Sequence, residues 1–268
     1  MSRRIVLSLS LACLFLIGAL AVSCGSSNSS SKACTGGPYN VVGNWQLTVT
    51  DTGGSPVTLY GAIDSAGLAL FFDNSVGSSG DTAELPALTG TCSFSGNINA
   101  YAEPGGPNSG SSAVDPAQGN VTSNSAFGGN FTGAASGTFS AASFSPLTGA
   151  VTPVSGNKTG AVQGALNLQP VLLPATFTPG GSNNSTSFTT SNTLENCTVT
   201  GTFTEVGTNN VFDVSITFSG TGCAITGTFT GIGFEASTDY FDINGGHADT
   251  YLYADILDGT NTFVIEFF

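Results

Sequence analysis

Short segments of alternating apolar and polar residues recur along most of the chain. The clearest is FDVSITFS at 212–219, in which aromatic or aliphatic residues occupy every second position. Similar alternation occurs at 44–50 and 262–267. A period of two, carried by Thr, Val and Phe, is typical of strands with one buried face. No window of a dozen residues has a sustained helical stripe, and 37 glycines disfavour long helices. The sequence therefore predicts an all-β protein.

A cysteine-containing repeat supports this fold class. CTVTGTFTEVG begins at Cys197, CAITGTFTGIG begins at Cys223, and a looser copy, CSFSGNINAYA, begins at Cys92. With a period of two, each cysteine falls on the apolar side of its strand. The central glycines suit a bend or a close backbone approach in a curved sheet.

Short polar turns join the predicted strands, which favours antiparallel neighbours. The stretch of about 104–193 is richer in Gly, Ser, Asn and Pro. Within it, we expect loops at 104–124 and 178–193, and weaker strands of the same sheet at 125–177. The prediction is a single antiparallel β domain over 34–268 that forms a closed or partly closed barrel. A two-sheet β-sandwich is the alternative.

The amino terminus has the features of an export signal. Arg3 and Arg4 precede an uncharged apolar run at 5–22 that ends in small residues. Ser8, Ser10 and Gly18 dilute this run, which disfavours the alternative of an uncleaved membrane anchor. The segment SRRIVLS is a partial twin-arginine pattern, but the strongly apolar run favours the general secretory route.

Leu20-Ala21-Val22-Ser23-Cys24 resembles the lipobox of bacterial lipoproteins, although Ala21 stands where that family usually has leucine. The resemblance implies that residues 1–23 are removed and that Cys24 is acylated, palmitate being a typical chain. Residues 24–33 then form the lipidated cysteine and a Ser-rich tether. Several acyl chains anchor a protein stably. Gly25, in place of an aspartate, favours the outer membrane over the inner one.

The excess of acidic residues limits which partners the exported chain can bind. After removal of the signal, Lys32 and Lys158 are its only lysine or arginine residues, against 17 acidic residues. Such a chain is unsuited to nucleic acid, whose phosphates are bound by Lys and Arg. It is equally unsuited to anionic lipid headgroups. We therefore expect the protein to attach to the membrane through its N-terminal lipid. Apolar residues make up 40% of the chain, which argues against general disorder.

The cysteines that follow the lipidation site are even in number. Cys34, Cys92, Cys197 and Cys223 in an exported protein indicate two disulfides, with three possible connectivities. No two of them form a CxxC pair, which disfavours zinc. The hairpin of 197–206 and 211–219, followed by a short turn, returns the chain toward Cys197. We therefore expect Cys197 to pair with Cys223, and Cys34 with Cys92.

Gly43-Asn44-Trp45 at the first strong strand resembles the G-x-W at the start of lipocalin-like barrels. The resemblance implies a ligand-holding barrel and makes Trp45 a candidate ligand-binding residue. Lipocalins usually pack an arginine against this tryptophan, and the processed chain contains none. A core tryptophan of any β domain is the alternative interpretation.

The sequence predicts no enzyme, cofactor or metal site. His247 is the only histidine, and it lies in a predicted turn without a recognisable nucleophile motif. Asp242, Asn244 and Asp249 carry oxygens suited to calcium, but only a fragment of a calcium loop is present. We interpret this region as an Asx-type turn and a surface loop.

Two tyrosines near these acids are further ligand-binding candidates. Tyr251 and Tyr253 share one side of a predicted strand, opposite Leu252, Ala254 and Ile256. If the aliphatic side is core, the tyrosines are exposed and suited to a sugar or a partner; in an open barrel they line a cavity. Ordinary cross-strand aromatic packing is the preferred interpretation.

Two functional hypotheses follow. The first is a lipid-anchored, non-catalytic envelope protein that holds an apolar or glycan-like ligand. The alternative is a structural or interaction lipoprotein with no small ligand and an unspecified protein partner. A ligand binder requires an enclosed volume of roughly 300 Å3 or more, whereas a structural protein has a filled interior.

The prediction from the signal is that lipid is attached at Cys24. Cells that produce the protein are labelled with a clickable fatty acid, and the wild type is compared with Cys24→Ala. We expect label on the wild type only. Equal labelling of both proteins would contradict the assignment.

Overall fold

The computed structural model describes residues 38–73, 82–101, 113–148, 151, 154–163, 171–180, 185–192, 196–223, 225–237, 251–257 and 262–268. The predicted signal, Cys24 and the tether lie outside these ranges. The described residues form sixteen strands. They include no helix long and apolar enough to cross a membrane.

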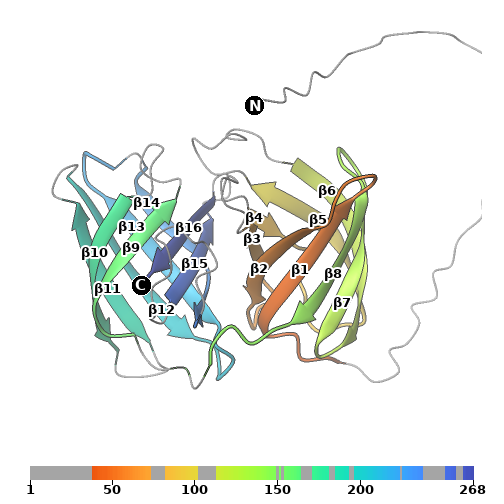
Figure 1. Cartoon of the computed structure of the whole chain (residues 1–268), viewed down its shortest axis with the longest axis horizontal. Coiled ribbons are helices and arrows are strands. Elements are labelled where there is room, and N and C mark those ends of the chain that lie inside the picture. The colour runs from red at the N-terminus through yellow and green to blue at the C-terminus, as the bar shows by residue number, and fades with distance from the viewer. Residues whose placement is uncertain are drawn as a thin grey trace, which may run out of the picture. The chain divides into compact units, whose positions relative to one another are not determined.

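The first eight strands close into one antiparallel barrel, here called barrel 1 (Figure 1). Each strand pairs with the next, and β8 pairs with β1 to complete the ring. The strands are β1 (Gly43–Asp51), β2 (Val57–Ile63), β3 (Ala69–Asp73), β4 (Thr82–Glu84), β5 (Ser93–Tyr101), β6 (Ala113–Ser123), β7 (Ala126–Phe131) and β8 (Gly137–Ser143).

The remaining eight strands close into a second antiparallel barrel, barrel 2 (Figure 1). Here β16 pairs with both β15 and β9. The strands are β9 (Gly156–Gln163), β10 (Val171–Pro179), β11 (Thr186–Asn192), β12 (Cys197–Glu205), β13 (Phe212–Ser219), β14 (Gly227–Ala236), β15 (Tyr251–Leu257) and β16 (Thr262–Phe267). Both barrels belong to one compact unit, Ala33–Phe268.

The all-β class, the antiparallel pairing and barrel closure are confirmed, and closure sets aside the sandwich alternative. The single barrel expected from the sequence is instead two. The predicted loops at 104–124 and 178–193 were wrong in part, because they contain β6 and β11. In β6 the inward positions include Ala117 and Gly119, which are too small to give an apolar signal. Gly119 is small for a reason: a Cβ there would clash with the ring of Phe94.

The repeat forms strands largely as predicted. Its copy at Cys197 is β12, which forms a hairpin with β13. The central glycine of this copy, Gly201, lies beneath the ring of Phe188, where a Cβ would clash, so the predicted close approach is confirmed there. The copy at Cys223 differs, because its strand begins only at Gly227.

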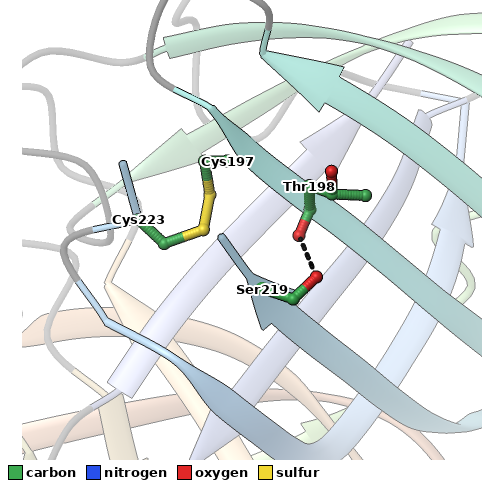
Figure 2. The surroundings of a disulfide bond; sticks show 4 residues. All are labelled: Cys197, Thr198, Ser219 and Cys223. Carbon is green, nitrogen blue, oxygen red and sulfur yellow. Dashed lines mark hydrogen bonds between the residues drawn. A yellow bond between two sulfur atoms is a disulfide. The ribbon is translucent and has the colours of Figure 1, made fainter. Parts of the chain in front are cut away.

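The Cys197–Cys223 disulfide is confirmed, with Cα atoms 4.7 Å apart (Figure 2). Cys223 lies in the turn after β13 rather than in a strand. Gly220, at a φ of +124°, starts this turn, and the N–H of Gly222 donates to Asn196 O at 3.5 Å. The turn therefore folds back over the start of β12. As a result, the disulfide does not have to cross the distance between two strands that flank a third. Cys92 is also disulfide-bonded, and Cys34 lies outside the described residues, so their pairing stays a prediction.

An apolar layer joins the outer faces of the two barrels. Phe72 of β3 stacks on Phe234 of β14, with ring centroids 5.9 Å apart, and lies 5.8 Å from the ring of Tyr253 of β15. The buried members of this layer come from both barrels: Ala62, Leu70, Phe72, Val211, Ile232, Phe234, Ala236, Tyr251, Tyr253 and Val264. Because the opposite side of β15 faces the barrel 2 core, this strand is buried on both faces.

Removal of the Cys197–Cys223 bond is expected to destabilise barrel 2. The two residues are 26 apart in sequence, and closing a loop of this length contributes about 3 kcal/mol in the chain-entropy model. We expect Cys197→Ala/Cys223→Ala to lower the free energy of unfolding, measured in urea, by about this amount.

Ser219→Ala is the control, because it removes only the neighbouring exposed hydrogen bond to Thr198 O at 3.4 Å (Figure 2). This control should change stability by less than about 0.5 kcal/mol. Equal unfolding curves for the double variant and the wild type would contradict the stabilising role of the disulfide.

Candidate ligand-binding cavity

Aromatic rings fill the interior of barrel 2. Phe177, Phe188 and Phe267 contact one another with ring centroids 4.8–5.2 Å apart. The inward rings in the core of barrel 2 are Phe177, Phe188, Phe203, Phe212, Phe218, Phe229, Phe263 and Phe267. Such tilted and edge-to-face packing is typical of a well-filled core.

Aromatic rings also fill one end of barrel 1. Trp45 packs against Phe127 with ring centroids 4.8 Å apart, and its Nε1–H donates to Val41 O at 2.8 Å. Phe94 lies 6.1 Å from both Phe127 and Phe139. Trp45 is only 1% exposed. It is therefore a core residue that fills this end of the barrel. This agrees with the alternative interpretation of the G-x-W motif, a core tryptophan of a β domain.

At the other end of barrel 1, the described side chains do not fill the interior. A cavity of about 270 Å3 lies there, lined mainly by apolar side chains that include Leu47, Leu59 and Ile98. Its origin is a row of three alanines on adjacent strands: Ala83 pairs with Ala100, and Ala100 pairs with Ala113. Three methyl groups leave space among the described residues here, whereas phenylalanine rings fill the interior of barrel 2.

One carboxylate lies in the wall of this cavity. Asp115 of β6 pairs with Ile98 of β5, and both line the cavity. Its side chain is 6% exposed. The N–H of Ala134, in the turn between β7 and β8, donates to Asp115 Oδ1 at 2.8 Å. Gly133 allows this approach, because a Cβ there would clash with the same oxygen.

The structure places the two candidate tyrosines away from this cavity. Tyr251 and Tyr253 are 1% and 0% exposed, in the apolar layer between the barrels. The Tyr253 hydroxyl donates to Glu266 Oε1 at 2.9 Å. The two tyrosines are therefore neither exposed for stacking on a sugar nor part of the cavity lining. They take part in aromatic packing, which was the preferred interpretation.

The candidates for acid–base or metal chemistry are not described. His247, Asp242, Asn244 and Asp249 all fall in the stretch 238–250, outside the described residues. Within the part of the chain that the structure describes, no three His, Cys, Asp or Glu side chains are grouped to hold a metal ion.

A larger cleft of about 630 Å3 lies where the barrels meet. Its polar lining already forms hydrogen bonds that join them. Asn44 Nδ2 donates to Asn209 O at 3.3 Å and to Asn210 O at 3.1 Å. Asn210 in turn exchanges two hydrogen bonds with the backbone of Glu235. The cleft is therefore primarily a junction, and the barrel 1 cavity is the better candidate site.

Sequence reasoning missed both parts of this site, Asp115 and the alanine row. Asp115 and Ala113 belong to a segment that was predicted as a loop. The available signal was the alternation of β6 itself, in which every second residue from Asp115 onward is small or aliphatic.

No protein-family model, curated protein or solved structure matches the chain. The interpretation of the cavity therefore depends on its own geometry and chemistry.

A second buried carboxylate lies at the junction of the barrels. The hydroxyls of Thr82 of β4 and Thr262 of β16 donate to Asp255 Oδ1 at 2.9 and 3.1 Å. Its Oδ2 is buried without a hydrogen-bond partner among the described residues. Burial raises the pKa of Asp255 from 3.8 to about 7, although the two threonine hydrogen bonds act in the opposite direction.

This shift predicts that stability falls as the pH rises. The pKa of Asp255 is higher in the folded than in the unfolded chain, so the folded state binds more protons between about pH 4 and pH 7. The resulting destabilisation, about 4 kcal/mol, is complete above pH 7 and absent below pH 4. Asp255→Asn removes it, so the advantage of this variant over the wild type in urea unfolding should grow from pH 4 to pH 8. Parallel stability–pH profiles for the two proteins would contradict this assignment.

Proposed function

We propose that the protein is a lipid-anchored, non-catalytic binding protein of the cell envelope, which holds a small apolar molecule in barrel 1. The observation that carries the proposal is the apolar cavity of about 270 Å3 beside the alanine row. Its lining favours an apolar ligand over a glycan, because among the described lining residues the polar side chains are Asp51, Thr82 and Asp115. Attachment to the membrane through Cys24 rests on the lipobox-like signal.

The cavity sets the size of the ligand. An apolar cavity of about 150 Å3 holds benzene, so about 270 Å3 corresponds to a body of roughly ten heavy atoms. This volume is slightly below the roughly 300 Å3 at which ligand pockets usually begin. A short alkyl chain or a single substituted ring fits within this volume.

The two barrels have different roles in this proposal. Barrel 2, with its filled aromatic core, is the rigid support against which the outer faces of β2 and β3 pack. The same filled interior favours the second candidate function, a structural or interaction lipoprotein without a ligand. The two functions differ only in whether the cavity of barrel 1 is occupied in use.

The first test is a native mass spectrum of protein purified from its source, followed by calorimetric titration with n-octanol. We expect a bound species of low mass, or saturable binding of n-octanol at a ratio of one per chain. No co-purified species and no n-octanol binding would overturn the proposal and leave the structural function.

A cavity-filling variant locates the site. Ala100 lies at the centre of the alanine row, so Ala100→Phe places a ring where the ligand would sit and should lower n-octanol affinity at least about tenfold. Ala142→Phe is the matched control, because Ala142 is exposed on the outside of β8. It should bind n-octanol like the wild type. Wild-type affinity in Ala100→Phe, with the fold intact by circular dichroism, would place the binding elsewhere.

A further inference from the structure

We infer that the barrel 1 cavity is selective for cationic amphiphiles: an ammonium group on a short apolar body, with the ammonium at Asp115. This inference rests on the proposed function and names the ligand class of the same site. It follows from the geometry of Asp115 and from the distribution of charge along the chain.

Asp115 is a mostly buried acidic side chain that receives little hydrogen bonding from the described residues. Its side chain is 94% buried, and the only hydrogen bond it accepts among the described residues is the one from Ala134 to Oδ1. Oδ2 accepts none there. Oδ2 is not fully enclosed, so a donor in the cavity can reach it. The open acceptor lies in a wall that is otherwise mainly Leu, Val, Ile, Ala and Phe. A ligand that carries an N–H donor beside an apolar body satisfies both parts of this wall.

The protein itself provides no cation for this role. Between residues 33 and 157 the sequence contains no lysine, arginine or histidine, so no basic side chain belongs to barrel 1. Asp51 adds a second carboxylate to the lining. The local field therefore attracts ammonium groups and repels carboxylates and phosphates. A fatty acid of the right length would leave two like charges close together without a counterion.

The loop that holds Asp115 fixes the carboxylate in place. The turn between β7 and β8 closes onto it through Gly133 and Ala134, so Oδ1 is oriented by the backbone. Because the carboxylate is already ordered, a ligand ammonium loses little affinity in organising its partner. Asp51, by contrast, is exposed at the end of β1, where water and salt weaken its interactions.

The test uses three ligands with the same eight-carbon chain: n-octylamine, n-octanol and n-octanoate, titrated into the full processed chain near pH 7. A charge-assisted hydrogen bond discriminates by about tenfold or more. We expect n-octylamine to bind at least about tenfold more tightly than n-octanol, and n-octanoate to bind more weakly than both.

Asp115→Asn is the decisive variant, because the amide oxygen can still accept the Ala134 N–H and preserve the fold. We expect it to lower n-octylamine affinity about tenfold while n-octanol affinity changes by less than about twofold. Asp51→Asn is the matched control: it makes the same change in net charge in the same lining but should lower n-octylamine affinity by less than about threefold. Thermal unfolding verifies that each variant is folded.

The outcomes separate this inference from the proposed function. Equal affinity of the wild type for n-octylamine and n-octanol would overturn the inference and leave the proposed function intact. Equal losses in Asp115→Asn and Asp51→Asn would also overturn it, because the preference would then come from overall charge. Failure of both n-octylamine and n-octanol to bind the wild type, with no co-purified species in the native mass spectrum, would overturn the proposed function itself.

Discussion

The size of the side chains that face inward decides what each barrel can do. An eight-stranded barrel has an interior just wide enough for side chains to fill, and every second residue of each strand points into it. In barrel 2 these positions carry phenylalanines, whose rings meet across the centre. In one half of barrel 1 they carry Ala83, Ala100 and Ala113, and a cavity remains. The same architecture thus gives one packed core and one core with space for a ligand.

The outer faces of the barrels have a second function, which is to hold the two together. Phe72, Phe234 and Tyr253 form an apolar contact between them, and the nearby carboxylate of Asp255 is buried with two threonine hydroxyls. The cost of burying this carboxylate appears as a raised pKa, so the junction is expected to be strongest when Asp255 is protonated. The filled barrel 2 then supports β2 and β3 of barrel 1, and β2 also contributes Leu59 to the lining of the cavity.

The sequence predicts those features that depend on large, locally alternating side chains. The hairpin of β12 and β13 and the Cys197–Cys223 bond follow from neighbouring residues and were confirmed. The second barrel, β6 and β11 were not foreseen. Barrel closure depends on pairing between distant strands, and β6 contributes mainly small inward residues. Alternation also cannot distinguish an outward face in water from one packed on another barrel, which is why Tyr251 and Tyr253 were candidates for exposure. The inward position of Asp115 can be predicted only when β6 is recognised as a strand. Lipidation at Cys24 and the Cys34–Cys92 pair stay predictions.

The central claim is that barrel 1 is a binding barrel with Asp115 as its polar contact. A crystal structure of the processed chain with n-octylamine tests it most directly. The account predicts the alkyl chain beside Ala83, Ala100 and Ala113, with its nitrogen about 2.7–2.9 Å from a carboxylate oxygen of Asp115. Protein side chains in that space, or n-octylamine bound only outside barrel 1, would contradict it.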